Sequence, residues 1–87
     1  MATPAATITA ALRAVQGRAG AGESDVARLE SALRASLEAI PGARVDYANI
    51  LDADSLSPIA RLERPALAAV AVFLGSTRLI DNVILGS

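Results

Sequence analysis

The side chains that most often perform catalysis are scarce in this sequence. It has no His and no Cys, and all eight of its basic residues are Arg, so Lys is absent as well. Without His the chain lacks the commonest general base at neutral pH and the commonest metal ligand. Without Cys it can form neither a disulfide nor a thiolate zinc site. The remaining candidates for chemistry are carboxylates, hydroxyls and arginines.

Two polar clusters contain residue types found in catalytic or binding sites, but their sequence pattern is typical of turns. Asp52 and Asp54 could form a carboxylate pair, yet Ser55 and Pro58 beside them favour a turn, and the further acidic ligands of an EF-hand loop are missing. Residues 75–77 (GST) lack both the G-x-S-x-G spacing of a nucleophile elbow and the lysine of a phosphate loop. We therefore expect a loop at the first cluster and a tight hairpin turn at the second.

The most informative polar residues lie in the apolar stretch 77–85 (TRLIDNVIL). Arg78 and Asp81 are three positions apart, so on a strand they point to opposite faces and do not pair directly. Asp81 then shares a face with apolar neighbours, where a carboxylate needs backbone N–H groups, another domain or an arginine as partner. The candidate arginines are Arg44, Arg61 and Arg64. We interpret Arg78, Asp81 and Asn82 as structural or interdomain polar anchors, and we assign no catalytic, cofactor-binding or metal-binding residue.

The first half of the chain predicts a helical hairpin. Thr3 is a suitable N-cap, and Pro4 suits the first helical position. After a glycine-rich break, Ser24 is the N-cap candidate for a second helix, on which Glu30 and Arg34 are spaced as an i,i+4 ion pair. Two apolar stripes with helical spacing support both helices: Ile8, Leu12 and Val15 on the first, and Val26, Leu29, Leu33, Leu37 and Ile40 on the second.

The second half predicts three strands, at 43–52, 66–74 and 77–85. The segment between the first two contains turn formers, followed at 59–63 by either a short strand or an irregular crossing. On the first strand we expect one face to carry Val45, Tyr47 and Leu51, and the other to carry Ala48 and Ile50. Tyr47, the only tyrosine, is expected to pack rather than to act as an acid.

The fold class that follows is α+β, an N-terminal helical hairpin packed on a small three-stranded antiparallel sheet, as a single domain over residues 1–87. The strand at 66–74 (ALAAVAVFL) is apolar on both faces, which is typical of a central strand covered on both sides. The two helices can cover one face only. The other face calls for a second copy or another domain, unless its alanines are simply exposed to solvent.

Charge and hydropathy limit the class of partner. The net charge of −1, with signs interspersed, gives no basic stripe, so nucleic acid is not an expected partner. The longest apolar run is about half of the length that a membrane-spanning helix needs. No basic segment followed by an apolar one marks a signal peptide at the start. We therefore expect a cytoplasmic protein that does not bind a membrane.

Four segments, taken in order, resemble the C-terminal domain of the pantothenate synthetase (pantoate–beta-alanine ligase) family. That domain has a Gly-Glu-x-Asp segment between two helices, a V-D-Y-like strand start, a D-x-x-(S/T)-L turn and a final (T/A)-R-L-I-D-N strand. The corresponding segments here are 22–25 (GESD), 45–47 (VDY), 52–56 (DADSL) and 77–82 (TRLIDN). The match in order extends over nearly the whole chain.

The resemblance implies a role in ATP-dependent pantothenate synthesis, in which ATP activates pantoate and beta-alanine attacks the acyl adenylate. In that family the chemistry, with its ATP and magnesium, belongs mainly to an N-terminal nucleotidyltransferase domain with H-x-G-H-like and K-M-S-K-S-like motifs. Both motifs are missing here, so no catalytic residue is carried over. The expected role is a lid domain that binds no cofactor itself, is not active alone, and has that N-terminal domain or a second copy as partner.

Two other hypotheses come from different classes of protein. The chain could be a free-standing oligomerisation or interaction module that uses this fold. It could also be a small-molecule-binding domain with a cleft beside Arg78. The oligomeric state and a ligand-dependent change in melting temperature distinguish these hypotheses from the lid.

Overall fold

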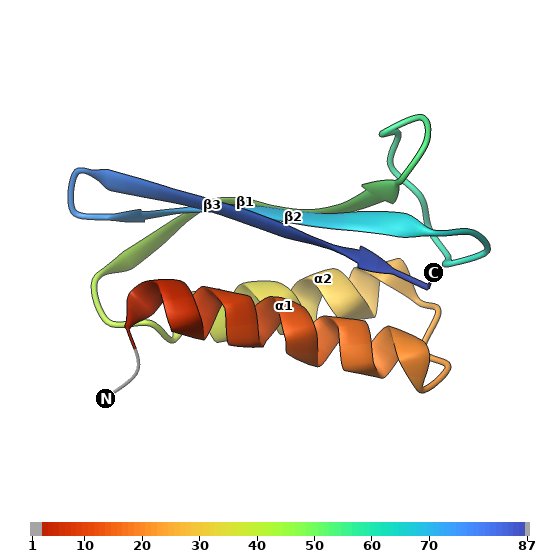
Figure 1. Cartoon of the computed structure of the whole chain (residues 1–87), viewed down its shortest axis with the longest axis horizontal. Coiled ribbons are helices and arrows are strands. Elements are labelled where there is room, and N and C mark those ends of the chain that lie inside the picture. The colour runs from red at the N-terminus through yellow and green to blue at the C-terminus, as the bar shows by residue number, and fades with distance from the viewer. Residues whose placement is uncertain (1–2, 87) are drawn as a thin grey trace.

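The computed structural model describes residues 3–86, and in it two helices lie beneath one face of a three-stranded sheet (Figure 1). The helices are α1 (Pro4–Gly20) and α2 (Val26–Glu38), and the strands are β1 (Ala43–Asp52), β2 (Ala66–Leu74) and β3 (Thr77–Leu85). Strand β2 lies between β1 and β3 and is antiparallel to both. The α+β fold is therefore confirmed, and the strand that is apolar on both faces is the central one.

Both helices begin at a capped residue and bury the predicted stripe. The Thr3 hydroxyl accepts a hydrogen bond from the Ala6 N–H at 3.2 Å, and Pro4 occupies the first turn of α1. For α2 the predicted cap is wrong by one residue, because Asp25, not Ser24, caps the helix. Ser and Asp are about equally good caps, so sequence alone does not separate them. The residues of both apolar stripes are buried.

A β-bulge in β1 changes which face one side chain occupies. The register shifts between Val45 and Tyr47, so that Val45 lies opposite Val72 and packs against the core, while Tyr47 lies opposite Ala71. The prediction that Val45 and Tyr47 share a face is therefore wrong, because the extra residue of a bulge reverses the alternation of side chains along the strand. The other predictions for β1 agree with the register: Ala48 and Ile50 share one face, and Leu51 lies on the opposite face.

The two faces of the sheet have different surroundings. The inner face, toward the helices, includes Val70 and Val72 of β2, both fully buried in the core. We define the outer face as the β2 residues Leu67, Ala69, Ala71 and Phe73 together with their register neighbours on β1 and β3. The alternative that the β2 alanines are simply exposed is wrong, because Ala66 and Ala68 are buried on the inner face, and on the outer face Ala71 has no exposed surface and Ala69 is half-buried.

The segment between β1 and β2 is an irregular crossing rather than a strand. It makes only isolated bridges, between Asp25 and Arg61 and between Leu51 and Pro58. The Leu62 N–H donates to the Ser24 carbonyl at 2.9 Å, which joins this segment to the loop between the helices. The crossing therefore fixes the end of the molecule where α2 begins.

Candidate functional site

The three predicted polar anchors of β3 are divided between the two faces of the sheet. Arg78 lies opposite Phe73 and Asn82 opposite Ala69, both on the outer face. Asp81 lies opposite Val70, on the inner face. The prediction that Arg78 and Asp81 point to opposite faces is confirmed, and these residues cannot form one cluster. Their use as interdomain anchors stays a prediction.

Arg78 belongs to a group of cations and aromatic rings near the β2–β3 hairpin. Its Nη2 donates to Oδ2 of Asp46 at 2.8 Å, and its guanidinium carbon lies 5.8 Å from the ring centre of Tyr47 and 5.9 Å from that of Phe73. The Arg44 guanidinium carbon lies 4.7 Å from the ring centre of Phe73. Because the ion pair is exposed, it contributes less than about 1 kcal/mol to stability. We name Arg44, Asp46, Tyr47, Phe73 and Arg78 the arginine–aromatic cluster.

The partner of Asp81 comes from α1. Its Oδ2 accepts a hydrogen bond from the Thr9 hydroxyl at 3.0 Å, and its Oδ1 accepts one from the Asn82 N–H at 2.8 Å. A backbone N–H was one of the partners predicted for Asp81, and the Asn82 N–H is such a partner. An arginine was another predicted partner, but no arginine of residues 3–86 forms an ion pair with Asp81. The arginines interact elsewhere: Arg44 with Phe73, Arg61 with Ser24 and Arg64 with Asp52. Thr9 was missed because its closeness to β3 depends on helix packing.

Side chains from the helices engage backbone groups of both edge strands. Oε2 of Glu30 on α2 accepts a hydrogen bond from the Ile50 N–H of β1 at 2.7 Å. On the other side, Nε2 of Gln16 on α1 donates to the Ile84 carbonyl of β3 at 2.9 Å. The predicted ion pair of Glu30 with Arg34 is wrong, since the ion pairs of residues 3–86 do not include it. Edge groups satisfied in this way are unavailable to a further strand.

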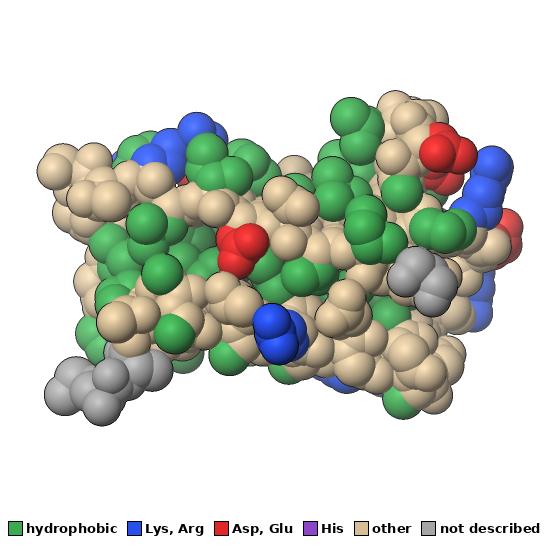
Figure 2. All heavy atoms as spheres, viewed as in Figure 1, with side chains coloured by type: hydrophobic (Ala, Val, Ile, Leu, Met, Phe, Trp, Pro, Cys, Tyr) green, Lys and Arg blue, Asp and Glu red, His purple; other side chains and the backbone are tan. Residues whose placement is uncertain are grey.

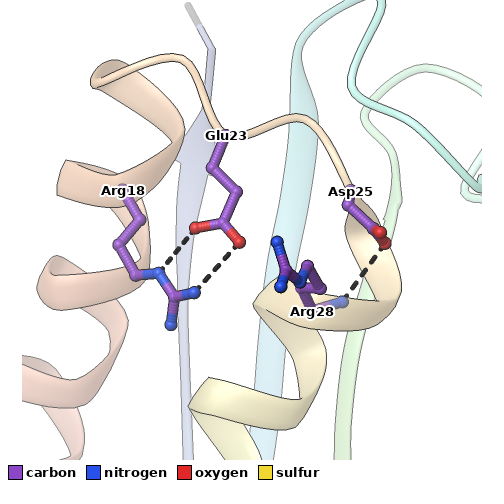
Figure 3. A network of polar contacts seen from close by, with 4 residues as sticks. All are labelled: Arg18, Glu23, Asp25 and Arg28. Carbon is purple, nitrogen blue, oxygen red and sulfur yellow. Dashed lines mark hydrogen bonds and ion pairs between the residues drawn. The ribbon is translucent and has the colours of Figure 1, made fainter.

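The GESD segment fixes the turn between the helices (Figure 3). Glu23 makes a two-pronged ion pair with Arg18 of α1, with N–O distances of 2.7 and 3.0 Å. Oδ1 of Asp25 accepts a hydrogen bond from the Arg28 N–H at 3.3 Å, which caps α2. The Ser24 hydroxyl accepts from Nη2 of Arg61 at 3.0 Å. Each polar residue of the segment thus has a structural partner.

Asp52 forms the turn that follows β1. Its Oδ1 accepts hydrogen bonds from the Asp54 N–H at 2.9 Å and the Ser55 N–H at 3.0 Å, which confirms the turn interpretation. The N–H of Ser55 and then that of Asp54 lower the pKa of the Asp52 carboxyl from its ordinary value. Burial opposes this effect, and Arg64, with Nε 3.8 Å from Oδ2, adds to the lowering of the pKa. The ionised carboxylate is therefore a structural element of the loop.

Stability should depend on pH through Asp52. Because the folded state lowers its pKa, the carboxylate stabilises the fold above the unfolded pKa of about 3.9, and this stabilisation is lost as pH falls through the folded pKa. Asp52→Asn is expected to lower the melting temperature at pH 7. The difference in melting temperature between wild type and variant should shrink between about pH 5 and pH 3, because carboxyl groups become protonated in this range. Melting followed by circular dichroism at each pH measures this.

Asp54→Asn is the matched control, because the Asp54 side chain is exposed and accepts none of the hydrogen bonds of the turn. It should leave the melting temperature nearly unchanged at every pH. A difference between wild type and Asp52→Asn that stayed constant from pH 7 to pH 3 would contradict the assignment.

The remaining polar features of residues 3–86 are a hairpin turn and two surface hollows. Gly75 and Ser76 form the tight hairpin turn between β2 and β3, as predicted, and Thr77 is the exposed first residue of β3. Within residues 3–86, no group of three or more acidic, His or Cys side chains could hold a metal ion. A surface hollow of about 310 Å³ includes residues 22–24 and 62–65, and neither it nor a second one along α2 includes Arg78. No helix of the described part is long and apolar enough to cross a membrane.

Comparisons with known proteins agree on one family. The family model described as pantoate-beta-alanine ligase matches residues 2–84. Pantothenate synthetase from Roseiflexus sp. (strain RS-1) is 48% identical over 75 residues, which are 86% of this chain and 27% of the relative. The one from Acidobacterium capsulatum is 43% identical over 79 residues, which are 91% of this chain and 26% of the relative. The crystal structure of pantothenate synthetase from Thermus thermophilus superposes with a TM-score of 0.78 at 35% identity, over 88% of this chain and 28% of that one. The chain thus spans about a quarter of the length of these relatives.

Proposed function

The chain belongs to the pantoate–beta-alanine ligase family, and on that basis we propose that it acts as the C-terminal lid domain of an ATP-dependent pantothenate synthetase. The observation that carries the proposal is the match of residues 2–84 to the family together with a span of only 27% of a full-length relative. In this proposal the nucleotide, magnesium and reacting groups bind to the larger remaining part of such an enzyme, in the cytoplasm.

The side chains of this chain support a role without chemistry of its own. The sequence contains neither His nor Lys, so it offers no side-chain general base whose ordinary pKa lies near neutrality and no lysine for phosphate binding. Several polar residues of the four family-like segments are engaged in structural contacts, such as Glu23 with Arg18 and Asp52 with its turn. We therefore expect that the chain alone makes no pantoyl adenylate from ATP and pantoate.

A chimeric enzyme tests this function. The matched segment of the Roseiflexus sp. (strain RS-1) relative is replaced by this chain, and pantothenate formation from ATP, pantoate and beta-alanine is measured. Because the chain would supply the same lid, kcat/KM should stay within about tenfold of the parent, a loss of no more than about 1.4 kcal/mol in the barrier. The relative truncated before the segment should be at least about a hundredfold less active, as expected when domain closure completes a site.

Two controls make the result specific. A chimera that carries an unrelated domain of similar length should be as inactive as the truncated relative. Turnover of ATP to pantoyl adenylate by this chain alone would refute the lid proposal. So would a chimera that is no more active than the truncated relative.

The exposed side of the sheet favours a second candidate, a free-standing oligomerisation or interaction module. Ile80 is 59% exposed and Ile84 is 40% exposed, and both lie on the outer face. Such a module would form one oligomer whose size does not depend on concentration. Sedimentation equilibrium of the isolated chain decides between the candidates, because a monomer across the accessible concentration range excludes the module.

A further inference from the structure

Both aromatic residues of the chain lie outside the core. The sequence has one Tyr, one Phe and no Trp, and the two rings belong to the arginine–aromatic cluster on the outer face. Aromatic side chains bury large areas and usually dominate the energetics of a core. The core of this chain is instead entirely aliphatic, and the rings of Tyr47 and Phe73 are only half-buried. The fold therefore places its aromatic residues on a surface, beside exposed arginines.

A β-bulge assembles the cluster. Along a regular strand Tyr47 would face away from Arg44. The register shift between Val45 and Tyr47 instead places Arg44 and Tyr47 on the same face of the sheet. Asp46 is the extra residue of the bulge, and its Oδ2 accepts a hydrogen bond from Nη2 of Arg78 at 2.8 Å. Bulges are common beside functional sites because they change the direction of side chains.

Two guanidinium groups flank a single ring. Arg44 on β1 and Arg78 on β3 are both register partners of Phe73 on the central strand. Their guanidinium carbons lie 4.7 Å and 5.9 Å from the centre of its ring, so the distance between the two carbons cannot exceed the sum of these values. The N–H donors of a guanidinium lie in its own plane, and a group that stacks on a ring keeps them free for an acceptor at its edge. The ring thus holds two sets of donors close together.

The charges of the cluster do not balance. Asp46 pairs with Arg78 through one nitrogen only, and within residues 3–86 no carboxylate lies within ion-pair distance of Arg44. Apart from Asp46, the described residues of the outer face include no Asp or Glu. Figure 2 shows basic side chains beside hydrophobic ones at the hairpin end of the sheet. The cluster is therefore a positive site on a chain whose net charge is −1, and an anion would complement it.

The arrangement of the donors favours a phosphate over a carboxylate. A carboxylate has two oxygens, and a single guanidinium can engage both of them. A phosphate group has three acceptor oxygens and more negative charge, so it can accept hydrogen bonds from Arg44 and Arg78 at once. Neither of the two surface hollows includes these arginines, so the ligand would bind on an open surface. Binding there should weaken as the salt concentration rises.

We propose that Arg44 and Arg78, positioned by the Phe73 ring, form a binding site for the phosphate group of a small molecule. Asp46 is an internal competitor in this site, because its carboxylate engages Arg78 when no phosphate is bound. That ion pair is exposed and contributes little to stability, so a phosphate can displace it. The site forms within this chain alone, so it goes beyond the lid function and is independent of it.

Titration of the isolated chain with sodium pyrophosphate at constant ionic strength tests the site. Nitrogen–proton NMR spectra follow the Nε–H groups of Arg44 and Arg78 and the backbone N–H of Phe73. These signals should shift to saturation, with a dissociation constant on the order of 1 mM. Arg44→Gln and Arg78→Gln should each raise that constant by at least about fivefold, because each removes one set of charged donors. Arg34→Gln removes an exposed guanidinium from α2 and should change it by less than about twofold.

Asp46→Asn should strengthen binding, which is the opposite of what the arginine variants do. Removal of the competing carboxylate should lower the dissociation constant by at least about threefold. Asp54→Asn removes the same charge from an exposed position of the loop after β1 and should change it by less than about twofold. Arg44→Lys keeps the charge but not the planar fork, and should bind at least about twofold more weakly than wild type. Circular dichroism verifies that each variant is folded.

Two sources of the phosphate group are compared in the same titration. Pyrophosphate supplies it free, and adenosine diphosphate supplies it attached to a nucleoside. Equal constants would mean that the phosphate alone is recognised, and a constant about tenfold lower for adenosine diphosphate would mean that the nucleoside adds contacts. Either result supports the site.

Three results would overturn the site. They are shifts that do not saturate, equal constants for wild type and Arg44→Gln, and binding of adenosine as tight as that of adenosine diphosphate. An inactive chimera together with intact pyrophosphate binding would remove the lid function and leave the phosphate site standing.

Discussion

Leu33→Ala is expected to lower the free energy of unfolding by about 3 kcal/mol, within the range of about 2–5 kcal/mol for buried leucines. Leu33 is fully buried on α2, in the core between the helices and the inner face of the sheet. A chain of 87 residues has a total stability of only about 4–13 kcal/mol, so this one change removes a large part of it. The melting temperature should fall by about 4–8 °C for each kcal/mol.

Urea unfolding followed by circular dichroism measures the effect, as a lower midpoint at an unchanged slope. Ile80→Ala is the matched control, because it also shortens an aliphatic side chain but one that is 59% exposed. It should change the stability of the isolated chain by less than about 0.5 kcal/mol. Equal losses for the two variants would mean that the outer face is already covered in solution.

Glu30→Ala is expected to destabilise the fold by about 1.5–3 kcal/mol, the usual contribution of a hydrogen bond to a charged group. Glu30 is half-buried on α2, and its carboxylate accepts the Ile50 N–H at 2.7 Å. Alanine leaves that N–H without its partner at the edge of β1. Glu30→Gln keeps an acceptor oxygen of the same reach and should recover more than half of the loss.

Glu38→Ala serves as the control, because Glu38 is exposed at the end of the same helix. Thermal and urea unfolding compare the four proteins, and amide hydrogen exchange at Ile50 reports the bond itself. Faster exchange at Ile50 in Glu30→Ala, restored in Glu30→Gln, is the expected pattern. If Glu30→Ala and Glu38→Ala were equally mild and exchange at Ile50 did not change, the contact would not matter in solution.

The elements could be predicted from the sequence because their signals are local. The three strands have the predicted bounds, since each is bordered by turn-forming residues within a few positions of its ends. The stripe on α2 is buried as predicted, because residues spaced by one helical turn share a face wherever the helix packs. One local signal failed: the bulge between Val45 and Tyr47 reversed a face, and it depends on how β1 pairs with β2.

The candidate anchors were identified in sequence, but not all of their partners. The spacing of Arg78 and Asp81 placed them on opposite faces, which the register confirms. The partner of Asp81 on α1, Thr9, is 72 positions away in the chain, and no periodicity connects the two. The contact of Arg78 with Asp46 likewise depends on the strand order. Strand β2 lies between β1 and β3, and the Arg78 side chain of β3 extends across β2 to Asp46 on β1.

The sequence by itself therefore determined the α+β class, the order of the elements, the central position of the apolar strand and the resemblance to one family. These depend on composition and on spacings of two to four residues, which a folded chain preserves. Only the tertiary structure decided that Glu30 engages an edge strand, that Asp81 is held by α1, and that the arginine–aromatic cluster lies on the face away from the helices. The physical reason is that the contacts of a polar side chain depend on which distant segment packs beside it, and that is set by burial of the whole core.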